Sequence, residues 1–188
     1  MVTFKDDIAT LTIIIGVVAI FSITDYNFNL ENGNFSISKK EKMTWDEENI
    51  SKQIHEHINH IRLKRGLSEL EYSKELDRIA SFHSKQMSKN NFFSHTTPEG
   101  QKITDRYDRF GVSCFTSAEN IYQTYLNENV EGVGFVDTRK KLADSVVEGW
   151  MNSPGHRKNI LLKNIESEGI GIYKNSEDRV YITQNFCS

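Results

Sequence analysis

The sequence predicts an α+β domain in which helices pack on a small antiparallel sheet. Two observations lead to this fold class. Between residues 46 and 152, apolar residues recur at the three- and four-residue steps of amphipathic helices. Near the end of the chain, two short runs rich in β-branched and aromatic residues flank a polar turn, as in a β-hairpin. Helices that precede a terminal hairpin are typical of α+β domains.

The first helix is expected to begin at Asp46 and to end at Gly66. Thr44 or Asp46 can cap its start, and Gly66 supplies the left-handed conformation that ends many helices. One apolar stripe runs along this helix at steps of four, four and three residues, formed by Ile50, Ile54, Ile58 and Ile61.

Three further helices are predicted from Ser73 to Asn90, over a short stretch after Gly100, and from Thr138 to Asn152. Their apolar stripes consist of Leu76, Ile79, Ala80, His83 and Met87 in the first, Ile103, Tyr107 and Phe110 in the second, and Leu142, Val146 and Trp150 in the third. Two strands close the chain, from Gly169 to Tyr173 and from Val180 to Phe186, and residues 119–124 are a further strand candidate.

Four histidines lie on the predicted helices. His57 and His60 are three residues apart and could share a metal, but we favour a solvated or half-buried flank for them and for the neighbouring His55. His83 is on the apolar side of its helix, so a hydrogen-bonded core histidine is expected there.

Length and composition indicate one globular domain with a tail. The chain has 188 residues, of which 37% are hydrophobic and 26% charged, so a core is feasible. The net charge of -3, together with the lack of a basic stripe interleaved with aromatic residues, gives no reason to expect a nucleic-acid partner.

Residues 1–24 are predicted to be a membrane anchor or a signal segment. Ile8 to Ile23 is an uncharged apolar run, predicted to be a hydrophobic helix slightly shorter than the ~20 residues that usually span a bilayer. An uncleaved anchor is favoured, because Asp6 and Asp7 depart from the basic start of a signal peptide and residues 22–25 match a cleavage site poorly. A buried core helix is the third alternative.

The positions of basic residues place the domain outside the cell. Lys5 precedes the apolar run and the next Lys or Arg is Lys39, which favours a cytoplasmic N-terminus. The domain is then expected at the cell membrane on its outer side, or secreted if the segment is cleaved. Residues 25–45 are expected to be a polar spacer and residues 46–188 the folded domain.

The two cysteines are Cys114 and Cys187. Outside the cell such a pair predicts a disulfide, which would tie the end of the chain to its middle. Two free buried thiols are the alternative.

Three polar residues in distinctive motifs are the candidates for chemistry. His156 lies in WMNSPGHRKNIL, where Pro154 and Gly155 are expected to break the preceding helix and turn the chain. A histidine on such a turn can stay accessible, as a metal ligand or a proton shuttle must. His95 lies in FFSHTTPEG, and Glu119, in SAENIY, lies between the two histidines.

Taken together and in this order, the motifs resemble the CAP superfamily of cysteine-rich secretory proteins, antigen 5 and pathogenesis-related 1, also called the SCP domain. The likeness covers roughly Ile50 to Cys187 and includes the closing EGIGIY and YITQNF, and SPGHRKNIL is similar to the bacterial and archaeal branch. The resemblance implies an α-β-α sandwich with a central cleft that holds two histidines and two acids. Three members map to His95, Glu119 and His156, while Ser153 stands where animal forms have a glutamate.

The resemblance suggests a site that could hold a divalent metal such as Zn²⁺. Two neutral imidazoles, His95 and His156, make an adequate half-site for zinc, and Glu119 could fix a histidine tautomer. Asn120, Ser153 and Gln184 are further candidates for lining the cleft. For Asn120 and Gln184 we favour a role in satisfying hydrogen-bonding groups in the core. A polar network that stabilises the cleft and does no chemistry is the alternative for the whole site.

Two functions follow from this reading. The first, which we favour, is an extracytoplasmic binding module that presents the cleft to an envelope component, a lipid or a protein. The second is a metal-dependent, peptidase-like hydrolase with Glu119 or His95 as general base. The sequence contains no GxSxG and no HExxH, so the hydrolase classes defined by those motifs lose support.

Overall fold

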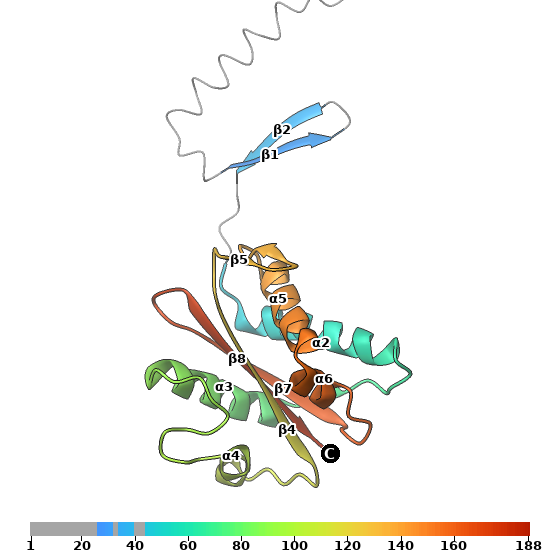
Figure 1. Ribbon diagram of the computed structural model, residues 1–188, viewed down its shortest axis with the longest axis vertical. Coiled ribbons are helices and arrows are strands. Elements are labelled where there is room, and N and C mark those ends of the chain that lie inside the picture. Colours follow the sequence, from blue (N-terminus) through green and yellow to red (C-terminus); the bar gives the residue numbers. More distant parts are fainter. Residues whose placement is uncertain (1–25, 32–33, 40–43) are drawn as a thin grey trace, which may run out of the picture. The chain divides into compact units, whose positions relative to one another are not determined.

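The computed structural model describes residues 26–31, 34–39 and 44–188 (Figure 1). The anchor or signal segment predicted for residues 1–24 lies outside the described residues. In the part that is described, no helix is both long and apolar enough to cross a bilayer.

The segment predicted to be a polar spacer contains two strands. β1 (Tyr26–Glu31) and β2 (Asn34–Lys39) pair antiparallel, with Tyr26 opposite Lys39 and Glu31 opposite Asn34. Polar and apolar residues alternate along both stretches, which is the period of a strand. This hairpin belongs to a unit separate from the compact unit Thr44–Ser188, and each unit is described by itself.

The domain is built on a four-stranded sheet with the strand order β3-β7-β8-β4. β7 (Ser167–Lys174), β8 (Arg179–Cys187) and β4 (Ser117–Tyr125) are antiparallel neighbours, as expected. β3 (Glu71–Tyr72) adds a parallel edge on β7, so the sheet is mixed and not wholly antiparallel. Two residues are too few to show a strand period, and therefore the sequence pattern did not predict β3.

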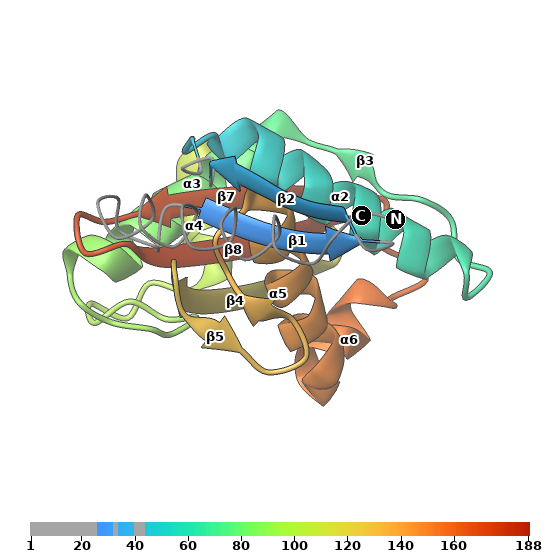
Figure 2. The ribbon, with the colours of Figure 1, turned by 90° about the horizontal axis from the view of Figure 1, so that it is seen from above.

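Helices cover both faces of the sheet and make the α-β-α sandwich (Figures 1 and 2). One face carries α2 (Glu47–Leu63), α5 (Arg139–Asn152) and α6 (Pro154–Ile160). The other face carries α3 (Lys74–Lys89) and α4 (Ile103–Phe110). A short hairpin, β5 (Asn129–Val130) with β6 (Gly134–Phe135), lies between β4 and α5 in the chain. The α+β fold class is confirmed.

Local signals in the sequence set the helix ends. The side chains of Asp46, Ser73 and Thr138 accept hydrogen bonds from the first-turn amides of α2, α3 and α5, as N-caps do. The prediction for Pro154 needs correction. It does end α5 near Ser153, but it also occupies the first turn of α6, where its fixed φ suits a helix start, so His156 lies on a short helix and not on a turn.

The larger core lies between the sheet and helices α2, α5 and α6. It contains the predicted stripe residues of α2 and α5 together with the apolar residues of β7 and β8; its fully buried members include Ile50, Ile54, Ile58, Leu142, Val146, Trp150, Ile160 and Ile182. Burial of such side chains is worth about 1.5–3 kcal/mol each. The core therefore fixes α5 and α6 against β4.

The disulfide between Cys114 and Cys187 is confirmed. The two residues are 73 positions apart, and closing a loop of that length stabilises a fold by about 4 kcal/mol in the chain-entropy model. The bond fastens the segment after α4 to the end of β8, close to the start of β4.

Helix α3 packs directly on the backbone of β7. A Cβ added at Gly171 would lie 1.8 Å from the backbone nitrogen of Ser81, and one at Gly169 would lie 2.1 Å from that of Asp77. The alternation of glycine with isoleucine along β7 thus gives one flat face for α3 and one apolar face for α2.

Gly171→Ala is expected to lower the free energy of unfolding by about 3 kcal/mol or more, because the new methyl group meets helix backbone that cannot move aside. Denaturant unfolding of the full chain measures the change. Gly155→Ala is the matched control, since a Cβ there meets nothing within 4 Å. Equal stability of the two variants would contradict direct packing of α3 on β7.

Candidate functional site

The structure brings His95, Glu119 and His156 together beside β4, the edge strand of the sheet. Glu119 is on β4 itself, His95 follows α3 in the loop before α4, and His156 comes from α6. His95 Nδ1 lies 2.9 Å from Glu119 Oε1. The ring centroids of His95 and His156 are 6.4 Å apart. An edge strand makes this meeting possible, because α6 and the His95 loop approach it from opposite faces.

Glu119 is a buried carboxylate whose two oxygens both have partners. Its side chain is 3% exposed, and Arg106 Nη2, on a fully buried side chain of α4, lies 2.5 Å from Oε2. Arg106 Nη1 also donates to the backbone oxygen of His95. With its amide nitrogen turned towards Glu119, Asn185 lies 3.1 Å from Oε2. The carboxylate is therefore held rigidly and its charge is matched inside the protein.

The contact with Glu119 sets the tautomer of His95. Nδ1 carries the hydrogen that the carboxylate accepts, so the lone pair of the ring is on Nε2. The side chain is 53% exposed, which makes His95 accessible as well as oriented.

His156 is positioned by two asparagines that connect α6 to β4. Asn120 Nδ2 donates to the backbone oxygen of His156, and Asn159 Nδ2 donates to Asn120 Oδ1 at 2.9 Å and to the backbone oxygen of Glu119 at 3.1 Å. Burial, with a smaller contribution from the nearby His95, lowers the pKa of the His156 imidazole below its usual range. His156 is accordingly neutral at neutral pH.

Gln184 and Asn120 belong to a buried hydrogen-bond network. Gln184 Oε1 accepts from Asn120 Nδ2 at 2.9 Å, and Gln184 Nε2 donates to Glu168 Oε2 at 2.5 Å. Glu168 is fully buried and its other oxygen lies 2.6 Å from His55 Nδ1. Both amides therefore act in the core, and Asn120 also supports the backbone of His156.

Ser153 is the junction of α5 and α6. Its amide donates to the backbone oxygen of Gly149 and its own backbone oxygen accepts from Arg157. It thus shapes the chain before His156 through its backbone. Among the described residues, no group of three or more His, Cys, Asp and Glu side chains is placed to hold a metal ion.

The remaining histidines behave differently from one another. His83 is fully buried, donates from Nε2 to the backbone oxygen of Ser94, and lies 3.9 Å from Glu119 Oε1, as a hydrogen-bonded core histidine should. His57 contacts Asp144 of α5 at 3.4 Å, and His55 contacts Glu168. His55 was expected on a helix flank, so its bond to a buried carboxylate is a finding of the structure.

Sequence reasoning missed Arg106, Asn159 and Glu168. The sequence does not show whether a polar or ionisable residue is buried, and no periodic pattern identifies the residue that will be its partner. The available signal was weak: Arg106 directly precedes the stripe residue Tyr107 on α4.

The sequence matches the cysteine-rich secretory protein (CAP) family over residues 55–186. The chain belongs to this family. The matched range contains His95, Glu119 and His156, together with their supporting residues Arg106, Asn120 and Asn159.

Two CAP relatives are bacterial proteins of Bacillus subtilis. The uncharacterized membrane protein YlbC is 35% identical over 135 residues, which are 72% of this chain and 33% of YlbC. The uncharacterized protein YkwD is 34% identical over 120 residues, 64% of this chain and 41% of YkwD. The chain thus spans well under half the length of these relatives.

Solved structures show the same fold. An extracellular protein with an SCP domain from Bacillus anthracis is 30% identical, with a TM-score of 0.63 over 82% of this chain and 46% of that protein. An outer surface protein from Borrelia burgdorferi has a TM-score of 0.64 at 19% identity, covering 77% of this chain and 96% of that one. These bacterial relatives agree with the CAP fold of the domain.

Arg106→Met is expected to lower the free energy of unfolding by about 3–5 kcal/mol, because Glu119 would remain buried without its countercharge. The double variant Arg106→Met/Glu119→Gln should lose less free energy of unfolding than the two single variants lose in sum. Denaturant unfolding of the four chains measures this coupling. Arg65→Met, at an exposed arginine, is the control, and additive losses would contradict a tight ion pair.

The stability of the domain should decrease in mild acid because of His83. Burial lowers the pKa of His83 to about 4 from 6.5. The unfolded chain therefore binds this proton first, so His83 contributes up to about 3 kcal/mol that is lost as the pH falls from about 6.5 to about 4. When unfolding is measured at several pH values, the free energy of unfolding should decrease less over this pH range in His83→Gln than in the parent chain. The exposed control His60→Gln should follow the parent chain, and equal slopes in all three would contradict the assignment.

Proposed function

We propose that this chain is an extracytoplasmic CAP domain that binds an envelope component, a lipid or a protein ligand, at the site formed by His95, Glu119 and His156. The observation that carries the proposal is that both carboxylate oxygens of Glu119 already have partners within the protein. Both of its oxygens are engaged, one by Arg106 and the other by His95, so the carboxylate orients its neighbours. Such a site offers fixed polar groups, chiefly His95 Nε2 and the His156 ring, to a ligand.

The position outside the membrane is part of the same proposal. It is supported by the apolar uncharged run of residues 8–23, by the disulfide, and by relatives described as extracellular, outer-surface or membrane proteins.

A divalent metal such as Zn²⁺ fits this site as a second component of the ligand. His95 Nε2 and a neutral His156 present two imidazole lone pairs, and Glu119 fixes the tautomer of the first. Two imidazoles on one tetrahedral zinc have ring centroids about 5 Å apart, somewhat less than the 6.4 Å found here. The exposed His95 side chain has room to close that difference. A metal held by two protein ligands would supply a Lewis acid whose remaining positions accept ligand atoms.

A metal-dependent, peptidase-like hydrolase is the second candidate. This candidate is supported by the hydrogen-bonded pair of His95 and Glu119, because a carboxylate that orients an imidazole is a common arrangement in general-base catalysis. In this version Nε2 of His95 takes the proton of a water in place of binding the metal, and Glu119 stabilises the imidazolium that forms.

The test exposes the full purified chain to a cell-envelope extract and identifies retained compounds by mass spectrometry. We expect a retained compound that is lost in both His95→Ala and His156→Ala. His60→Ala is the matched control, because His60 is exposed on α2 away from the site, and it should retain the compound. Retention by all variants would contradict binding at the site.

The same chains decide between the two candidates and test the metal. Zinc titration by calorimetry should give micromolar affinity in the parent and in His60→Ala, and no binding in the two site variants. Cleavage of the retained compound into two products whose summed mass is one water greater, lost in His95→Ala, would establish the hydrolase in place of the binding module.

A further inference from the structure

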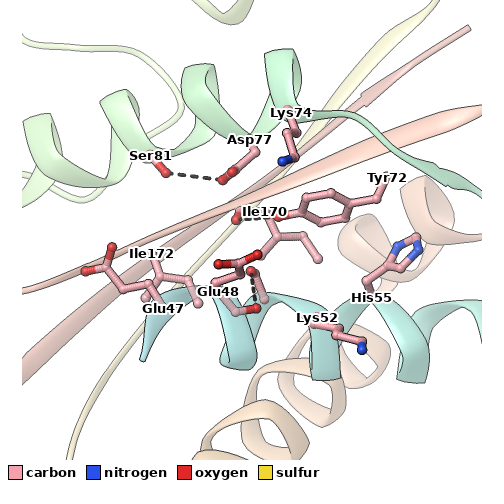
Figure 3. A pocket seen from close by; sticks show the side chains of 11 residues that line it. Glu47, Glu48, Lys52, His55, Tyr72, Lys74, Asp77, Ser81, Ile170 and Ile172 are labelled. Carbon is pink, nitrogen blue, oxygen red and sulfur yellow. Dashed lines mark hydrogen bonds between the residues drawn. The ribbon is translucent and has the colours of Figure 1, made fainter. Parts of the chain in front are cut away.

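A groove of about 580 Å³ lies away from the candidate site, between helices α2 and α3 (Figure 3). This volume is within the range of small-molecule sites. Its floor is the edge of β7, where Ile170 and Ile172 contribute apolar surface, and Tyr72 lies towards one end. None of the lining residues belongs to the site beside β4.

The groove exists because β3 covers only the beginning of β7. β3 pairs with Ser167 and Glu168 and then passes into α3. Beyond that point the Tyr72 hydroxyl donates to the backbone oxygen of Ile170 at 3.3 Å. Carbonyls of alternate residues in a strand point to the same side, so Ile172 also presents its backbone polar groups to this edge. A ligand with peptide groups can therefore be recognised along the floor.

Charges of both signs line the groove, with three carboxylates towards one end and Lys74 beside one of them, Asp77, on α3. Glu47 and Glu48 lie on the first turn of α2, with Asp77 facing them from α3. Lys52 and Tyr72 lie towards the opposite end, with His55 beside them. The carboxyl of Asp77 has a raised pKa, chiefly because of burial and also because of Glu47 and Glu48, with Ser81 and Lys74 acting in the opposite direction. The three carboxylates outnumber Lys74 at this end, so an added positive charge there would be stabilising.

The spacing of these charges specifies the length of a matching ligand. Glu47 and Lys52 are five residues apart on a helix, which is about 7.5 Å along its axis. An extended peptide advances about 3.3–3.6 Å per residue, so two or three residues separate an ammonium from a carboxylate by this amount.

We propose that the groove between α2 and α3 binds a short zwitterionic peptide of two or three residues. Its ammonium group lies among Glu47, Glu48 and Asp77, and its carboxylate is held at the Lys52 end. Its backbone follows the edge of β7, and apolar side chains contact Ile170 and Ile172. Lys52 is available for this role, since its contact with Glu56 is an exposed pair 3.9 Å long that contributes little.

The test is a calorimetric titration of the full chain with the tripeptide trialanine. We expect saturable binding that is weakened about tenfold or more by acetylation of the peptide's amino group and by amidation of its carboxyl group. Asp77→Asn and Lys52→Gln should each weaken binding of the unmodified peptide by about tenfold, the effect of one charge-assisted hydrogen bond.

Matched controls remove the same charges elsewhere. Asp108→Asn on α4 and Lys85→Gln on α3 are exposed and outside the groove, and they should leave the affinity unchanged. Absence of binding, or equal effects of groove and control variants, would overturn the proposal. Undiminished binding of a peptide blocked at both ends would assign the groove to an internal strand segment and would also overturn terminal recognition. Because no groove variant touches the site beside β4, the result is independent of the function proposed for that site.

Discussion

The ion pair between Glu119 and Arg106 is the interaction on which the candidate site depends. A carboxylate with 3% exposure is unfavourable without a partner, and Arg106 supplies that partner from a separate element, α4. The same guanidinium donates to the backbone of His95, so one buried cation positions both the acid and the histidine loop. The Cys114–Cys187 disulfide lies just beyond α4 and fastens this segment to the sheet. The backbone and Nδ1 of His95 are thus held by buried groups, while the rest of its side chain stays exposed.

A second buried carboxylate organises the opposite face of the sheet. Glu168 bonds to His55 of α2 and to Gln184 of β8, and Gln184 continues to Asn120 of β4. Asn120 in turn bonds to the backbone of His156. An unbroken series of hydrogen bonds therefore crosses three strands, from α2 to α6. Each member is satisfied by its neighbours, which is the condition under which a buried polar network rigidifies a core.

The fold was predictable from sequence wherever structure follows a repeating pattern. The isoleucines of α2, the caps at Asp46, Ser73 and Thr138, and the closing strands all have local signals, and these elements form where they were expected. The motifs around His95, Glu119 and His156 likewise identified the residues that meet beside β4. Arg106, Glu168 and Asn159 were not predictable, because their roles depend on contacts between elements distant in the chain. β3 was missed because its two residues pair with residues of β7 that are more than ninety positions away in the chain.

The two edges of the small sheet account for the positions of the two proposed recognition surfaces. An edge strand leaves backbone groups unpaired, and proteins commonly cover them. On the β4 edge, α5 and α6 provide the cover: Asn159 of α6 donates to the backbone of Glu119, and Trp150 of α5 donates to that of Ile121. This cover brings His156 to His95. On the β7 edge, β3 is short and the Tyr72 hydroxyl reaches only Ile170, so an uncovered stretch lies between two charged helices. One edge is closed by protein side chains and creates a histidine site, while the other is left open and suits a ligand that can supply the missing peptide groups.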